Sequence, residues 1–374
     1  MSNIYLDYTA DTPVNPEVLD YFCFVEKEYG GNPNSHHQNG LKAKEYLEQS
    51  QNNLRQLLNI EDRDIIYTSG ASESNNLAIK GYVQRKRHFG KHILTNPLEH
   101  PSVSAPLTFL KDTGYDVEML KVNKDGKIDI NDLKNKLRDD TILVTVMAVD
   151  SELGVIQPIE EIQETLKDYP NCALLTDATQ AIGKIDINLN IADMYSCSAH
   201  KFYGLKGSGL LIKGKDIVME PLIHGGTSTS IYRSGTPAVS LNCSIEKALE
   251  LSLQDLDRNY AYVRSLNETL RQFFSQYKNV EINSPVDSIP HILNISVKGL
   301  NGNKMQELLN DKGVCVSVKT ACSVEGMPSR AVMSMYNDRK RALESFRISL
   351  SHLTSKEEIN EFENIFDQVI NNVS

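Results

Sequence analysis

The sequence of 374 residues lacks long apolar runs and an N-terminal targeting pattern. Its longest strongly apolar stretch, residues 142–149, is far shorter than the roughly 20 residues that a membrane-spanning helix needs. The first residues contain neither a basic segment nor an apolar one, so no secretory signal is predicted. We therefore expect a cytoplasmic protein that does not contact the membrane.

Cysteine pairs and an excess of positive charge are also missing. The six cysteines form no Cys-x-x-Cys pair, which argues against a zinc cluster, a disulfide framework or any other metal site. Lys and Arg number 39 against 49 Asp and Glu, which gives a net charge of -10. This balance disfavours direct binding to nucleic acid or to an anionic membrane. There is no internal repeat and no low-complexity tract.

What is present is the pattern of a folded α/β protein. Hydrophobic residues make up 40% of a chain that is long enough for two domains. Helix-length segments, such as 41–58 and 158–167, alternate with short strand-like runs at 64–67, 92–95, 141–149, 173–176, 194–197 and 209–212. This alternation predicts a largely parallel sheet with helices around it.

The C-terminal part has a different pattern. Apolar residues at helical spacing between 238 and 274 predict one or two long helices at the joint between two domains. Strand-like runs follow at 291–297, 314–317 and 346–350, and a capping box from Thr354 to Glu357 opens a last amphipathic helix. We predict a large domain over residues 15–255 and a smaller α+β domain from 1–14 and 256–374.

Three strand ends carry residues that suit one cofactor. Lys201 ends one predicted strand before a glycine-rich turn, Asp177 and Gln180 end another, and Gly70 begins a turn into a helix near Ser72. Taken singly, these are a solvated lysine, a cap and an ordinary turn. Together they provide a lysine that can form a Schiff base, a carboxylate for a pyridinium nitrogen and free amides for a phosphate, which is the set that pyridoxal phosphate requires.

The chain resembles the cysteine desulfurases of the class V, fold-type-I pyridoxal phosphate family over nearly its whole length. Nine markers occur in family order: Tyr5-Leu-Asp-Tyr-Thr-Ala10, Gly31-Asn-Pro-Asn-Ser-His36, Thr68-Ser-Gly-Ala-Ser-Glu-Ser-Asn-Asn76, Glu99-His100, Asp177-Ala-Thr-Gln180, Ser198-Ala-His-Lys201, Arg233-Ser-Gly-Thr236, Ala321-Cys322 and Arg347-Ile-Ser349.

The resemblance implies a role for each matching residue. Lys201 would bind the cofactor covalently, Asp177 would pair with the ring nitrogen, Gln180 would approach the ring oxygen and His100 would stack on the ring. The phosphate group would be bound by Ala71, Ser72, Ser198 and His200, together with Thr236 from the neighbouring subunit, which implies a homodimer.

The substrate residues follow from the same resemblance. Arg347 would bind the carboxylate of L-cysteine, with Asn32 as a weaker candidate for the same end of the substrate. Cys322 would take the sulfur and become a persulfide. The 25 residues from Cys322 to Arg347 (347 minus 322) resemble the group of the family with a long cysteine loop, which passes sulfur to an acceptor protein.

Three segments depart from the family pattern. Ser151 replaces an asparagine expected near the ring hydroxyl, and Lys319 precedes Cys322 where a glycine is usual. Residues 227–230 lack the usual continuation of the glycine pair before them.

We predict a cytoplasmic homodimer that uses pyridoxal 5'-phosphate to convert L-cysteine to L-alanine. The acceptor of its sulfur would be an iron–sulfur scaffold or a tRNA-thiolation enzyme. Two alternatives stay open: a class V aminotransferase or selenocysteine lyase relative, and a weakened homologue that binds a partner.

Overall fold

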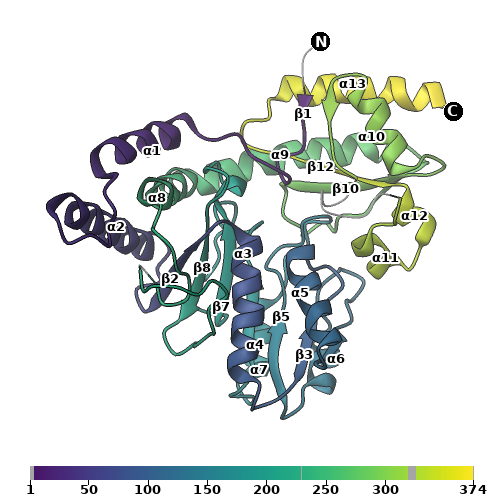
Figure 1. Cartoon of the computed structure of the whole chain (residues 1–374). Coiled ribbons are helices and arrows are strands. Elements are labelled where there is room, and N and C mark those ends of the chain that lie inside the picture. The colour runs from purple at the N-terminus through teal and green to yellow at the C-terminus, as the bar shows by residue number, and fades with distance from the viewer. Residues whose placement is uncertain (1–3, 229, 319–325, 374) are drawn as a thin grey trace.

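The structure is a computed structural model that describes residues 4–228, 230–318 and 326–373. Its larger part contains a seven-stranded sheet in the order β2-β8-β7-β6-β5-β3-β4, in which β8 alone runs against its neighbours (Figure 1). These strands are β2 (Arg63–Thr68), β3 (His92–Thr95), β4 (Asp116–Met119), β5 (Thr141–Thr145), β6 (Ala173–Asp177), β7 (Met194–Ser198) and β8 (Gly209–Gly214).

Helices cover both faces of this sheet, because most of its strands are buried on both sides. Successive strand residues point to opposite faces, so Leu174 joins one core and Leu175 the other. The core that includes Leu175 packs under η1 (Leu77–Gly81), α4 (Tyr82–Lys86) and α5 (Pro101–Asp112), and α3 (Ala71–Asn76) leads directly into η1. The core that includes Leu174 packs under α1 (Pro16–Tyr29), α2 (Gln38–Leu57), α7 (Ile159–Leu166) and α8 (Val239–Gln254), with α6 (Ile130–Lys136) beside them.

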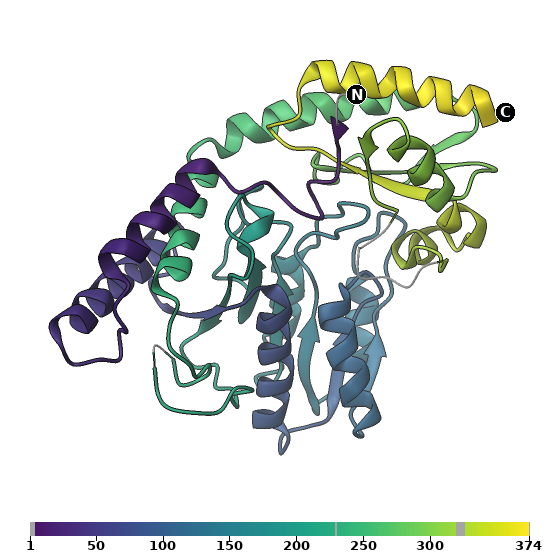
Figure 2. The ribbon, with the colours of Figure 1, turned by 45° about the horizontal axis from the view of Figure 1, so that its top comes forward.

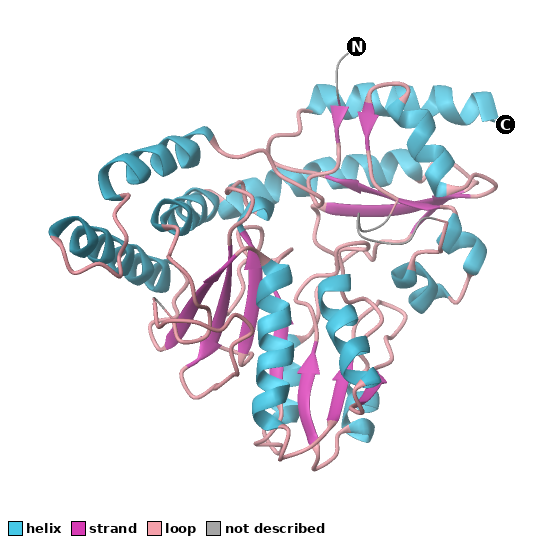
Figure 3. Cartoon of the chain, viewed as in Figure 1, coloured by secondary structure: helices cyan, strands magenta, loops and turns pink. Residues whose placement is uncertain are grey.

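The smaller part contains an antiparallel sheet in the order β12-β10-β9 and a parallel pair of β1 with β11, as Figure 3 shows. The strands are β1 (Ile4–Tyr5), β9 (Val280–Ile282), β10 (Ile292–Val297), β11 (Val314–Cys315) and β12 (Ser345–Ser349). The helices are α9 (Leu256–Phe274), α10 (Gly302–Asn310), α11 (Arg330–Tyr336), α12 (Arg339–Leu343) and α13 (Lys356–Val373). The larger part also contains a short turn, η2 (Ala199–Lys201), directly after β7. One core joins Ile4 and Leu6 to residues from Val263 onward, so the N-terminus packs with the C-terminal part.

The two parts are joined where α8 ends and α9 begins, and Figure 2 shows these helices leading from one part to the other. A small apolar cluster of Leu98, Met147, Leu153 and Val155 with α11 and α12 fills a second contact. The predicted fold class is confirmed, whereas the predicted boundaries at 15–255 stay a prediction. Within the described residues, no helix combines the length and the apolar character needed to cross a membrane.

Several predicted elements differ in their bounds. The strand predicted over 141–149 ends at Thr145, and the strand predicted over 314–317 ends at Cys315. The predicted capping box was wrong by one residue, since Ser355 and Glu358 exchange the two hydrogen bonds at 2.7 and 3.1 Å. Both Thr354 and Ser355 fit the sequence pattern, but Thr354 instead accepts a bond from the backbone of Ser351.

Candidate active site

A cavity of about 280 Å³ lies where β6 and β7 end and the smaller part meets the sheet. Carboxyl ends of parallel strands meet at one edge, which brings together side chains that are far apart in the sequence. Ten of the predicted site residues line this cavity: Ala71, Ser72, His100, Ser151, Asp177, Gln180, Ser198, His200, Lys201 and Arg347.

Lys201 reaches the cavity from the turn η2 after β7. Its ammonium group donates to the backbone carbonyls of Thr9 and Ala10 at 2.9 and 2.5 Å. Burial, followed by the charge of Arg347, lowers the pKa of Lys201 from 10.5 to about 8. A lysine in this state loses its proton readily and becomes a nucleophile.

Asp177 is the last residue of β6 and is 8% exposed. Its Oδ2 accepts a hydrogen bond from Asn75 Nδ2 at 2.8 Å, and its Oδ1 accepts one from the amide of Thr179 at 3.0 Å. Asn75 also accepts from the Ser196 hydroxyl through its Oδ1 at 2.5 Å. This network fixes a carboxylate at the cavity wall.

His100 stands at the N-terminus of α5 and faces the same cavity. Its Nδ1 accepts the backbone N–H of Ser102 at 3.1 Å, so the hydrogen of the neutral ring lies on Nε2. Burial lowers the pKa of His100, which favours the neutral ring. The flat ring is therefore held in place by the cap that it forms.

The turn between β2 and α3 brings backbone amides to the cavity. Gly70 has φ +143°, a conformation that residues with a Cβ rarely adopt, and it lets the chain turn sharply into α3. The amide of Ala71 donates to the Ser198 hydroxyl at 2.7 Å. His200 lies near them with its pKa lowered to about 4, chiefly by burial and next by the charge of Lys201.

Arg347 enters the cavity from β12 of the smaller part and is 2% exposed. Its guanidinium donates through Nη2 to Asp7 Oδ1 and through Nη1 to the carbonyl of Ser151, both at 2.8 Å. Its Nε is buried without a hydrogen-bond partner. A donor held in this way can bind a carboxylate in the cavity.

Three predicted site residues do not line this cavity. Asn32 is exposed, and its Oδ1 accepts the amide of Asn34 at 3.0 Å, so its substrate contact stays a prediction. Thr236 is exposed in the segment 221–237. Cys322 and Lys319 lie outside the described residues.

Several residues of the site were not predicted from the sequence. Asn75 stands inside the marker that ends at Asn76, but the marker does not indicate that it binds Asp177. Thr9 and Ala10 end the first marker, but they bind Lys201 through their backbone carbonyls, so their side chains give no signal of this contact. Lys184, four residues after Gln180, was also missed.

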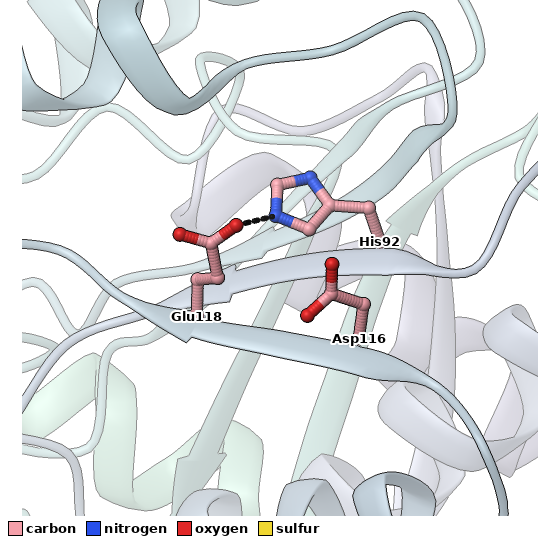
Figure 4. Close-up of side chains that lie close together, drawn as sticks. All are labelled: His92, Asp116 and Glu118. Carbon is pink, nitrogen blue, oxygen red and sulfur yellow. Dashed lines mark ion pairs between the residues drawn. The ribbon is translucent and has the colours of Figure 1, made fainter.

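A cluster of potential metal ligands lies outside this cavity, where β3 and β4 begin (Figure 4). His92 is buried, and its Nε2 lies 3.3 Å from Glu118 Oε1. Arg138 already pairs with Asp116 at 2.8 Å and with Glu118 at 3.7 Å. Because a guanidinium satisfies both carboxylates, we interpret this cluster as an ion-pair network that fastens β4 to the sheet.

The fold and the cavity define a fold-type-I transferase, with a large sheet domain, a smaller domain and a lysine at the strand ends. The model of the aminotransferase class-V family matches residues 4–362, and the chain belongs to this family. A NifS/IcsS protein homolog of Lactobacillus delbrueckii is 36% identical, with 99% of this chain and 98% of that protein covered. The cysteine desulfurase IscS of Dictyoglomus turgidum is 35% identical, with 98% and 94% covered.

Solved structures agree with this assignment. A NifS-like protein superposes with a TM-score of 0.92 at 29% identity, with 99% of this chain and all of that chain covered. A structure described as SspA in complex with cysteine superposes with a TM-score of 0.82 at 28% identity, with 95% and 100% covered.

Proposed function

We propose that this chain is a pyridoxal-phosphate-dependent cysteine desulfurase. It converts L-cysteine to L-alanine and leaves the sulfur as a persulfide on Cys322. The observation that carries the proposal is the meeting of Lys201, Asp177 and Arg347 at one cavity, although the three come from different elements and from both parts of the chain. The full-length likeness to proteins named cysteine desulfurase supports this choice of reaction.

The residues present fit pyridoxal phosphate. Lys201 has a lowered pKa, and within the described residues its amine bonds only to backbone carbonyls, which suits a bond to an aldehyde. Asp177 offers a fixed carboxylate to a ring nitrogen. The Ala71 amide donates to the Ser198 hydroxyl, so these two hydrogen-bonding groups lie side by side, where each could donate to a phosphate oxygen. Ser72, His200 and, from a neighbouring subunit, Thr236 complete the proposed phosphate site.

The chemistry divides between the cofactor and the chain. When bound, the cofactor supplies an electron sink for the substrate carbons. Arg347 orients the substrate by its carboxylate, and Lys201, once free, moves protons at the substrate carbons. The Cys322 thiol gives up its proton, and its thiolate attacks the substrate sulfur. The carbon–sulfur bond breaks, its electron pair goes to the carbon, and the carbon takes up a proton to become the methyl group of alanine. The products are alanine and a persulfide on Cys322.

The remaining roles belong to the same proposal. His100 stacks on the ring, Gln180 approaches the ring oxygen, and Ser151 lies near that oxygen. The enzyme acts as a cytoplasmic homodimer, and an acceptor protein of iron–sulfur assembly or tRNA thiolation takes the sulfur. Asn32 reaches the substrate only if the dimer brings it there.

The test is alanine formation from L-cysteine with a thiol reductant, after loading with pyridoxal phosphate. We expect the parent to form alanine, and we expect Lys201→Ala and Cys322→Ser to form none. Lys206→Ala is a matched control, because Lys206 is exposed and pairs with Asp11 rather than lining the cavity. It should keep the parent activity.

Two outcomes would contradict the proposal. Sulfide release by Cys322→Ser at the parent rate would remove Cys322 from the mechanism. Amino-group transfer to a keto acid by the loaded parent, without alanine formed from cysteine, would instead favour an aminotransferase.

A further inference from the structure

A second lysine lies behind the cavity and has no role in the reaction described above. Lys184 ends the turn that follows β6 and is 8% exposed. Its ammonium group donates to Gln180 Oε1 at 2.5 Å. In the described part of the chain no carboxylate forms an ion pair with it. Burial of a lysine without an acidic partner is costly, so its presence requires an explanation.

The turn aims Lys184 back at Gln180. Gly183 has φ +74°, and a Cβ at this position would lie 2.8 Å from Phe202 Cβ. The amide of Lys184 donates to the carbonyl of Ala181 at 3.0 Å, which closes the turn. The two side chains, four residues apart, therefore meet on the same side of the chain.

The bond to Lys184 determines which way the Gln180 amide points. Gln180 Nε2 donates to the Thr9 carbonyl at 3.1 Å, and the same carbonyl accepts from Lys201 at 2.9 Å. If the amide flipped, its NH2 group would face the lysine and its oxygen would face the Thr9 carbonyl. Both contacts are repulsive. The second N–H of Nε2 is left for a ligand in the cavity, which Gln180 lines.

We propose that Lys184 is a positioning residue, which fixes the Gln180 amide so that its Nε2 donates to the anionic ring oxygen of the bound cofactor. This inference rests on the proposed function, because it places the cofactor in the cavity. Lys184 acts through Gln180 and does not itself line the cavity.

Two basic groups act on Lys184. Burial and the charges of Lys201 and Arg347 lower the pKa of Lys184 to about 7. His200 and His291 also interact with it, but their pKa values, lowered to about 4 and about 3, leave both rings uncharged near neutral pH. Below about pH 7 the amine is charged and can only donate, so it holds the Gln180 amide in this orientation. Above that pH the neutral amine can also accept, and the Thr9 carbonyl is then the contact that opposes a flipped amide.

The test measures the pH midpoint of the absorbance change of the lysine-bound cofactor. An N–H donor on the ring oxygen favours the deprotonated chromophore, so losing it raises this midpoint. We expect Lys184→Met to raise it by about half a unit or more. Lys184→Gln keeps an N–H donor and should shift it less, and the exposed Lys215→Met should leave it unchanged. An unchanged midpoint in Lys184→Met, or an equal shift in Lys184→Gln, would overturn the proposal.

A second measurement needs no cofactor. Lys184→Met and Gln180→Met are compared singly and together by urea unfolding of the cofactor-free protein. If the two side chains hold each other, the losses in the free energy of unfolding caused by the single changes do not add up to that of the double variant. Additive losses would overturn the proposal.

A parent that never gains cofactor absorbance would overturn the proposed function instead. The comparison of single and double variants would then decide by itself whether Lys184 holds Gln180.

Discussion

At the scale of single residues, the ion pair of Asp7 and Arg347 joins the N-terminus to the substrate side of the cavity. Arg347 is almost fully buried, and Asp7 also accepts the Ser317 hydroxyl at 2.7 Å. Asp7→Asn leaves a buried guanidinium without its counter-charge. We expect it to lower the free energy of unfolding by about 2 to 4 kcal/mol, measured by urea denaturation.

A matched control for this change is Asp62→Asn, because Asp62 is fully exposed in its ion pair with Lys215. Exposed pairs contribute little, so this variant should unfold with the parent. Equal stability of Asp7→Asn and the parent would show that the buried pair does not stabilise the fold.

Asp150 provides a prediction about pH. Burial, followed by the charge of Glu152, raises the pKa of Asp150 from 3.8 to about 7. The folded protein therefore holds this proton more tightly than the unfolded chain, and ionised Asp150 destabilises the fold. The penalty grows as the pH rises from about 4 and is complete above about 7.

The variant Asp150→Asn cannot ionise, and its amide oxygen can still accept the backbone N–H groups of Glu152 and Leu153. We expect it to exceed the parent in stability by about 1 to 3 kcal/mol at pH 8 and by much less at pH 5. Urea unfolding at both pH values measures this. If the variant exceeded the parent in stability by the same amount at pH 5 and at pH 8, ionisation of Asp150 would not be the cause of the difference.

At the scale of elements, His100 combines a cap with a predicted site role. Its ring accepts the amide of Ser102 at the start of α5. We expect His100→Ala to lose about 1 kcal/mol of stability, whereas His100→Asn restores a cap and stays near the parent. Both variants lack the ring, so both should bind pyridoxal phosphate more weakly in a titration. If His100→Asn lowered the stability as much as His100→Ala, the cap would not account for the loss of stability.

The strands and helices of this chain were predictable where hydrophobic periodicity is strong. The helices after residue 238 were predicted because their apolar residues follow the helical period, and the strand at residues 92–95 because it is a short β-rich run. β4 was missed because its residues are partly or fully exposed, which leaves no apolar run. The strand predicted up to residue 149 ends earlier, since the apolar residues 146–149 are buried as a loop.

The site followed the same division. Side chains that are proposed to contact the cofactor directly, such as Lys201 and Asp177, stand in motifs that the sequence shows. Residues that act through a neighbour, such as Asn75 and Lys184, become visible only when the turns after the strands are folded. The ion pair of Asp7 with Arg347 could not be predicted, because it joins residues 340 positions apart.

At the scale of the whole molecule, the described residues 221–228 and 230–237 form a segment that is a candidate dimer contact. Three of its apolar side chains, Leu222, Ile223 and Ile231, are 41%, 44% and 67% exposed. The segment is fixed to the larger domain, since Arg233 pairs with Glu73 at 3.1 Å. Apolar side chains gathered in one exposed segment are what an interface between subunits covers.

This arrangement gives a prediction for the mass in solution. We expect the parent to have twice the mass of one chain by light scattering, and Ile231→Glu to shift toward a single chain, because a buried carboxylate would oppose association. If Thr236 reaches the cofactor phosphate of the neighbouring subunit, this variant should also retain less pyridoxal phosphate after gel filtration. Val286→Glu is the matched control, since Val286 is 92% exposed outside this segment and should leave the mass unchanged. If Ile231→Glu kept the mass of the parent, the subunits would associate through another surface.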